Sequence, residues 1–152
     1  MEITLPNADS QSPGPDPSQL RRERLRLADF RFTRTPDGRC SAEVALELDR
    51  TEVRGTAVGL SNSMVDLRIA SEATLVALDA FTEHSYRFEL IGVKAVRAFD
   101  ANVIIVSVAM KHGLGPQRLL GVALVEEEPV RGAVLAVLNA TNRILGNFIA
   151  TR

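Results

Sequence analysis

The sequence predicts an α+β fold in which a strand–strand–strand–helix unit occurs twice in tandem. Apolar residues first alternate with a period of two, as in strands, and then recur with the helical period of 3.6, and this order occurs once before residue 84 and again after it. The two helical stretches also match each other in sequence. We expect antiparallel sheets, each covered by one helix, with repeat halves at about 25–84 and 85–150.

Residues 25–60 are predicted to form a three-stranded antiparallel meander. The parity of the apolar residues changes between Leu27 and Phe30, which predicts a β-bulge near Ala28-Asp29. The turn residues Thr35-Pro36-Asp37-Gly38 separate this strand from a second one at 40–48, whose strict alternation predicts one buried and one solvated face. After a short turn at Asp49-Arg50, the inward face of the third strand carries Val53, Gly55, Ala57 and Gly59.

The stretch Met64 to Phe81 is predicted to form the first helix, which covers one face of the meander. The segment Ser61-Asn62-Ser63 supplies candidates for the N-cap, because short polar side chains there accept hydrogen bonds from the free amide groups of the first turn. The apolar stripe of this helix consists of Leu67, Ala70, Ala73, Ala77 and Phe81, with Leu75 and Leu78 beside it.

The second half is predicted to repeat this order. Residues 86–99 form a strand or a bent pair that turns at Asp100-Ala101 and leads into a more fully apolar strand at 103–108. A turn at Gly113-Leu114-Gly115-Pro116 precedes the sixth strand at 119–125. The last helix runs from about Val130 to Phe148, since proline and carboxylates in the segment 126–129 favour a helix start.

Short matches between the halves indicate an internal duplication. Residues 73–80 align with residues 133–140, with four of the eight positions identical. Gly55-Thr56-Ala57 matches Gly121-Val122-Ala123, and Ala42-Glu43-Val44 matches Ala101-Asn102-Val103. These alignments make the second strand–helix junction six residues shorter than the first.

Composition and charge favour one soluble domain with a tail. The chain has 152 residues, a formal net charge of -1 and a single cysteine, so neither a disulfide framework nor a general attraction to nucleic acid or anionic lipid is expected. Residues 1–20 are proline-rich and polar, which predicts a disordered tail ahead of a single domain at 21–152. Neither a signal peptide nor a membrane-spanning run is recognisable, so we expect a cytoplasmic protein that makes no membrane contact.

No set of residues in the sequence predicts a catalytic site, a cofactor or a metal. His84 and His112 fall in separate loops, and two separated histidines with one cysteine lack the spacing of metal ligands. Cys40 faces inward by strand parity, which favours a packing role over a reactive thiolate. The run Glu126-Glu127-Glu128 lacks the spaced ligands of a calcium loop and is expected to be a solvated helix start.

The glycine pair Gly55 and Gly59 has two interpretations. Close packing of a strand against a helix is favoured, because glycine lets two backbones approach each other. Alternatively, the pair lets the backbone approach a small ligand, with Ser61 and Asn62 as hydrogen-bond donors and Asp66 as the partner of an ammonium group.

The arrangement resembles the C-terminal regulatory and dimerisation domain of 2-isopropylmalate synthase, which is likewise a tandem strand–strand–strand–helix duplication. Three motifs within residues 25–149 carry the resemblance: Gly55-x-Ala57-x-Gly59, Asp66-x-x-x-Ala70-Ser71 and Leu138-Asn139-Ala140. The family's catalytic barrel is absent from this sequence, so the resemblance concerns the accessory domain alone. In that family the end-product amino acid binds near the strand–helix junctions, at the interface of the two halves. The resemblance therefore implies a ligand site at Gly59, Ser61, Asn62, Asp66 and Ser71. The second junction, 125–129, lacks glycines and is rich in carboxylates, which does not favour a matching second site.

Three functions are open at the level of sequence. We expect a non-catalytic regulatory, assembly or small-metabolite-sensing domain that forms a symmetric homodimer through its edge strands or docks on an enzyme. One alternative is a hot-dog-like enzyme of the thioesterase or cyclase type, although a single long sheet around a helix fits six strands and two helices less well.

Another alternative is a nucleic-acid-binding accessory protein that uses the arginine-rich first strand. Its basic residues are Arg21, Arg22 and Arg24, with Arg26 and Arg31 beyond them. The charge balance and the aromatic content of only 5% make nucleic acid the less favoured partner.

Overall fold

The computed structural model of the chain describes residues 24–113, 115–126 and 128–150, and its element order is the one that the sequence predicts. Three antiparallel strands are followed by a helix, and the same order then repeats, which confirms the tandem βββα–βββα arrangement. The predicted tail at 1–20 lies outside the described residues, as do Arg21 and Arg22.

Each unit contributes one sheet and one helix. The first unit contains β1 (Arg26–Arg34), β2 (Arg39–Leu48), β3 (Thr51–Leu60) and α2 (Ser63–Phe81). The second unit contains β4 (Arg87–Ala98), β5 (Ala101–Lys111), β6 (Pro116–Val125) and α3 (Pro129–Ala150). The strands pair in sequence order, so the first sheet is β1-β2-β3 and the second sheet is β4-β5-β6. These two separate sheets differ from the single sheet that a hot-dog fold wraps around its helix.

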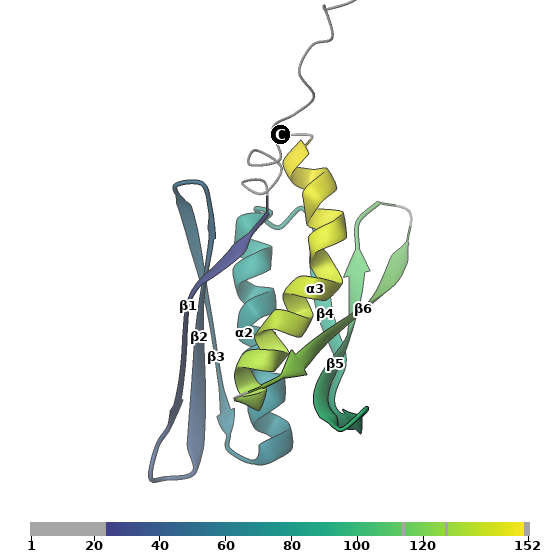
Figure 1. Cartoon of the computed structure of the whole chain (residues 1–152). Coiled ribbons are helices and arrows are strands. Elements are labelled where there is room, and N and C mark those ends of the chain that lie inside the picture. Colours follow the sequence, from purple (N-terminus) through teal and green to yellow (C-terminus); the bar gives the residue numbers. More distant parts are fainter. Residues whose placement is uncertain (1–23, 114, 127, 151–152) are drawn as a thin grey trace, which may run out of the picture.

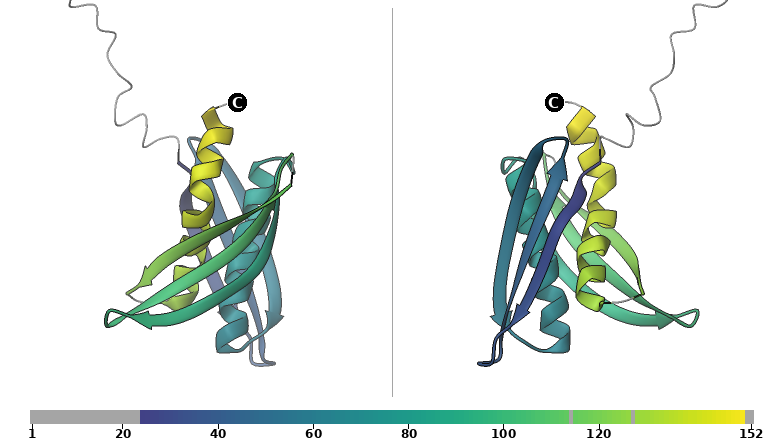
Figure 2. Two further views of the ribbon diagram at one scale, coloured as in Figure 1. Left: turned by 90° about the vertical axis from the view of Figure 1, so that its right-hand side faces the viewer. Right: turned by 60° about the vertical axis from the view of Figure 1, so that its left-hand side comes forward.

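The two helices lie between the two sheets (Figure 1). Helix α2 packs on β2 and β3 and also contacts β4 of the other unit, whereas α3 packs on β5 and β6 and contacts α2. One core therefore joins both units, and its largest completely buried side chains come from both: Leu46, Leu78, Ile104 and Leu145. The outer face of each sheet points away from the helices (Figure 2).

Most of the local predictions are confirmed. The pairing of β1 with β2 shifts register between Leu27 and Asp29, which is the predicted bulge. Asn62 caps α2, because its side-chain oxygen accepts hydrogen bonds from the backbone N–H groups of Met64 and Val65, at 3.0 and 2.9 Å. The predicted stripe of α2 is buried throughout, and Cys40 is buried as its parity predicts.

The turn between β4 and β5 differs from the prediction. The strand ends at Ala98, and the turn residues are Phe99 and Asp100 rather than Asp100 and Ala101. Both have left-handed backbone angles, with φ of 53° and 59°, as a two-residue hairpin turn matching the twist of its strands requires. The apolar character of Phe99 suggested a strand residue, but its side chain is fully exposed at the tip of the hairpin.

The packing of glycine against helix reveals the true register of the duplication. A Cβ atom at Gly55 would lie 2.1 Å from the carbonyl oxygen of Ala73, and one at Gly121 would lie 1.9 Å from the carbonyl oxygen of Ala136. Ala73 therefore corresponds to Ala136, so the predicted alignment with Ala133 is wrong by three residues. Because alanines recur every three or four residues on this face of α3, a comparison of the two helix sequences is compatible with more than one register.

The predicted alignment of the strands between the two units is corrected in the same way. Val44 is the register partner of Gly55 and Val106 is the register partner of Gly121, so residues 42–44 correspond to 104–106 and not to 101–103. Ala73 follows Gly55 by 18 residues and Ala136 follows Gly121 by 15, which makes the second connection three residues shorter rather than six.

Candidate functional site

The predicted ligand site at the first strand–helix junction is built around the buried carboxylate of Asp66. Arg34, at the end of β1, donates two hydrogen bonds to Asp66 Oδ2, from Nε at 3.0 Å and from Nη2 at 2.8 Å. The Ser61 hydroxyl donates to Asp66 Oδ1 at 2.9 Å. Asp66 itself exposes only 5% of its surface, whereas the Arg34 side chain is 58% exposed and lies over the Phe32 ring.

The electrostatics of this junction keep Asp66 ionised. Burial by itself would raise the pKa of Asp66, but the hydrogen bonds from Arg34 and Ser61, with the charge of Arg34, outweigh burial and hold the pKa below its ordinary value. Burial raises the pKa of the nearby Cys40 thiol, and the neighbouring Asp66 carboxylate raises it further. Cys40 is therefore a protonated, buried thiol, which has little nucleophilic character.

The polar atoms of the junction are engaged with one another. Ser61 and Arg34 satisfy both carboxylate oxygens of Asp66, and Asn62 caps the helix. An ammonium group could reach Asp66 only by displacing Arg34, which has the partly exposed side chain of this pair. The geometry as it stands joins the end of β1 and the residue that follows β3 to the first turn of α2.

Three other predicted residues make packing contacts or a hydrogen bond within the helix. Gly55 lies under the backbone of α2, and a Cβ atom at Gly59 would lie 2.8 Å from the Ile69 side chain, so both glycines allow close packing of β3 against the helix. Ser71 is fully buried and donates its hydroxyl proton to the backbone oxygen of Leu67, at 2.8 Å. The structure therefore brings Ser61, Asn62 and Asp66 together but places Gly55 further back along β3 and Ser71 further along α2.

The remaining candidates are spread over the surface. Arg24 is exposed, and two of the arginines that follow it are already paired: Arg26 with Glu47 at 3.7 Å and Arg31 with Asp29 at 3.2 Å. Among the described residues, no group of three or more histidine, cysteine or acidic side chains is placed to hold a metal ion. None of the described helices combines the length and the apolar character needed to cross a membrane.

The two histidines lie in loops near the C-terminal end of α2. His84 Nδ1 lies 2.6 Å from Asp79 Oδ2, and the His112 ring stacks on Tyr86 with the ring centroids 4.1 Å apart. His112 Nδ1 also lies 3.1 Å from the backbone oxygen of Ser85. Both rings therefore help to hold the loop that connects the two units.

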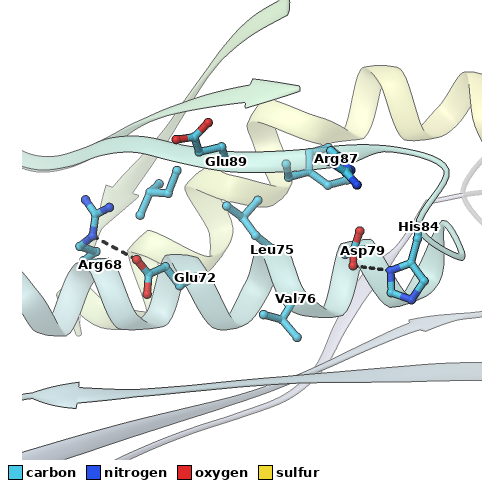
Figure 3. Close-up of a pocket in the computed structure, with 10 residues that line it drawn as sticks. Arg68, Glu72, Leu75, Val76, Asp79, His84, Arg87 and Glu89 are labelled. Atoms are coloured by element: carbon cyan, nitrogen blue, oxygen red, sulfur yellow. Dashed lines mark hydrogen bonds and ion pairs between the residues drawn. The ribbon is translucent and has the colours of Figure 1, made fainter. Parts of the chain in front are cut away.

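A groove of about 770 Å³ runs between α2 and β4, and it was not predicted from the sequence (Figure 3). Helix α2 forms one wall, and β4 forms the other. The groove is lined from the helix by Arg68, Glu72, Leu75, Val76 and Asp79, and from the loop and strand by His84, Arg87, Phe88, Glu89 and Leu90. Its walls belong to different units, so only the packing of one unit against the other brings them together.

The outer faces of the two sheets differ in their charged side chains, although the first sheet also exposes Val58 and Leu60 on β3. On the first sheet, ion pairs join charged side chains of neighbouring strands, such as Arg54 with Glu43 and Arg26 with Glu47. On the second sheet, Leu120, Val122 and Leu124 of β6 expose 66%, 50% and 57% of their surface. The half-buried Val103 and Ile105 of β5 lie beside them.

Comparison with known proteins assigns no family to the chain. The sequence matches no family model, and no curated protein is similar enough to count as a relative. The resemblance to the 2-isopropylmalate synthase regulatory domain therefore rests on the residues described above and stays a prediction.

Proposed function

We propose that the chain is an assembly domain that forms a symmetric dimer by stacking the outer face of its second sheet on the same face of a second copy. The observation that carries this proposal is the row of exposed aliphatic side chains on β6, Leu120, Val122 and Leu124. Large apolar side chains that are exposed together mark interaction surfaces more often than isolated ones do.

The strand register extends this row into a continuous apolar face. Register partners on neighbouring strands point to the same side of a sheet, so each residue of β6 has neighbours on β5 and β4. Leu124 lies in a row with Val103 and Val96, and Val122 lies in a row with Ile105 and Lys94. Lys94 lies on the edge strand, where its long aliphatic stem lets the amine reach solvent while the stem covers apolar surface.

The first sheet provides an internal comparison, since it has the same topology but an outer face that combines ion pairs with the exposed Val58 and Leu60 of β3. There Arg54 pairs with Glu43 and Glu52, and Arg26 pairs with Glu47. The fold therefore does not require an apolar outer face, which supports a separate role for that face on the second sheet.

The size of the face suits a second copy. Three strands spaced about 4.8 Å apart, with about ten residues rising about 3.3 Å each, present an outer face of about 14 by 33 Å, in which the rows of Leu124, Val122 and Leu120 are bordered by a row with Glu89 and Arg118. Stacking two such faces covers about 1,000 Å² in total, which reaches the lower range of specific interfaces. Sheets stack readily at a separation of about 10 Å, and a twofold contact places the same apolar surface on both sides.

Light scattering coupled to size exclusion tests the proposal, because one chain has a mass of 16.5 kDa. We expect twice that mass for the wild-type chain and a single-chain mass for Val122→Lys, which places a charge in the middle of the apolar face. Val58→Lys is the matched control, since Val58 is an exposed valine, at 72%, on the outer face of the first sheet. A wild-type monomer at about 100 µM, a concentration well above the Kd of ordinary specific complexes, would overturn the proposal. A dimer that survives Val122→Lys would overturn it too.

A further inference from the structure

We infer that the groove between α2 and β4 binds an extended peptide of a partner protein, which joins the second sheet as a fourth strand beside β4. The peptide carries a basic residue, an apolar residue and an acidic residue, in that order from N to C. This site lies at the edge of the second sheet, whereas the assembly surface proposed above lies on its outer face.

The first step in the argument is the free edge of β4. In the part of the chain that the structure describes, this strand of 12 residues pairs with β5 alone, so every second residue turns its backbone N–H and C=O toward the groove side. Within the described residues, β4 takes part in no backbone hydrogen bond of the turns and loops. The opposite edge of this sheet is partly closed, because the Asn139 side chain accepts a hydrogen bond from Val122 N–H at 3.0 Å. Strand addition satisfies such an edge with main-chain hydrogen bonds.

The second step is the wall that α2 provides beside this edge. Arg68, Glu72, Val76 and Asp79 follow one another along the helix face that borders the groove (Figure 3). Leu75 lies between these residues and the strand, and Val76 exposes 48% of its surface. An added strand would therefore rest one of its faces on a helix wall of charged side chains with Leu75 and Val76 among them, and of these two only Val76 is exposed.

The third step is charge. On the helix wall, Arg68 pairs with Glu72 at 3.0 Å, and Asp79 pairs with His84 at 2.6 Å. On the strand wall, Arg87 and Glu89 form no ion pair with any described residue, and they stand two positions apart on the same side of β4. Opposite charges placed across from each other stabilise neighbouring strands, so these two side chains select the charges of the added strand.

The order of charges in the peptide follows from antiparallel pairing. A basic residue stands opposite Glu89, and an acidic residue two positions later stands opposite Arg87. The residue between them stands opposite Phe88, which packs against the core, so its side chain points to the same side and is apolar. The bulge between Leu90 and Gly92 ends the regular edge, which limits the pairing to about five residues.

A second copy of this chain fits the edge less well than a partner peptide does. Arg87-Phe88-Glu89 has the required order, so two copies of β4 could pair around Phe88. Because β4 begins at Arg87, that register would join only the three residues 87–89 of each strand. A separate peptide has no such limit and can follow the whole regular edge.

Binding of two blocked pentapeptides to the full chain tests the inference, with amide NMR shifts and hydrogen exchange as the readout. One peptide, Val-Lys-Val-Glu-Val, has the required order, and the other, Val-Glu-Val-Lys-Val, has the charges exchanged. We expect the first to shift and protect amides of β4 and to bind about fivefold more tightly than the second, the effect of two cross-strand charge pairs. In the double variant Arg87→Glu with Glu89→Arg, we expect this preference to reverse. N-methylation of the peptide residues one at a time should weaken binding of the first peptide at alternate positions, where the N–H group faces β4.

Three results would overturn the inference. The first is the absence of any β4 shift with either peptide at about 5 mM, a concentration above the Kd of the weak complexes that short peptides form. The second is equal binding of both peptides to the wild-type chain. The third is a β4 shift that grows with protein concentration alone, which would assign the edge to a second copy. Val122→Lys, which breaks the proposed dimer, should not change the binding of either peptide. The dimer proposal and the peptide proposal can therefore fail independently of each other.

Discussion

Replacement of Gly55 by alanine tests how closely β3 and α2 approach each other. The added Cβ atom would lie 2.1 Å from the carbonyl oxygen of Ala73 and 2.4 Å from the backbone nitrogen of Ala77, whereas real Cβ atoms essentially never come within 3.0 Å of such neighbours. Strand and helix must therefore separate by about 1 Å at this point. Both obstructing atoms are backbone, so no change of rotamer relieves the contact.

The cost of Gly55→Ala follows from two opposing effects. Overpacking of a core costs about 1–3 kcal/mol, and a clash with backbone places this site at about 3 kcal/mol. Alanine is preferred over glycine within a strand by about 0.5–1 kcal/mol, which offsets part of that cost. We therefore expect a net loss of about 2 kcal/mol in the free energy of unfolding, and a Tm lower by about 8 °C.

Urea unfolding followed by circular dichroism measures this loss. Gly121→Ala should behave like Gly55→Ala, because a Cβ atom there would lie 1.9 Å from the carbonyl oxygen of Ala136. Gly92→Ala is the matched control, since it also lies in a strand but a Cβ atom there would meet nothing within 4 Å. The reasoning is refuted if Gly55→Ala unfolds within about 0.5 kcal/mol of the wild type, the range of neutral surface substitutions. It is refuted equally if Gly92→Ala is as harmful.

Three further substitutions have expected outcomes. Asp66→Asn should cost about 2 kcal/mol at pH 7, because it removes charged hydrogen bonds at a buried site. Since folding lowers the pKa of Asp66, its contribution is present above the ordinary value of 3.8 and is lost as the pH falls through the lower folded pKa. The stabilities of the two proteins in urea titrations should therefore converge as the pH is lowered below 3.8. Asn62→Ala should cost about 1 kcal/mol through the lost N-cap, and thermal melting that is unchanged would contradict the assigned cap. Gly146→Ala should stabilise the chain by about 0.5–1 kcal/mol, because alanine favours a helix and a Cβ atom there meets nothing within 4 Å, and a lower Tm would contradict this.

Features that depend on neighbouring residues were predictable from the sequence. The bulge between Leu27 and Asp29 follows from a change of parity, and the Asn62 cap follows from a short polar side chain ahead of a helical period. The turn at Phe99 was misplaced because hydrophobicity and turn geometry conflict there. The geometry of the hairpin prevails, because two residues with positive φ close it.

Features that depend on contacts between residues far apart in the sequence were not predictable. The carboxylate of Asp66 was predicted to be a partner for a ligand, but Arg34, 32 positions earlier, occupies one of its oxygens. No local pattern announces that contact. The groove between α2 and β4 likewise exists only because one unit packs on the other. The correct helix register required the contact of Gly121 with Ala136, since the sequence alignment favours Ala133.

Chemical cross-linking tests the central claim, that the outer face of the second sheet joins two copies. Ser107 lies on this face in the middle strand β5, and Ser41 occupies a comparable place in the middle strand β2 of the first sheet. Each is replaced by cysteine in turn and treated with a bismaleimide about 8 Å long, which suits sheets stacked about 10 Å apart. The native Cys40 is buried and serves as the background. We predict a covalent dimer from Ser107→Cys and only monomer from Ser41→Cys and the wild type, whereas equal cross-linking of both variants, or of neither, would contradict the proposed assembly.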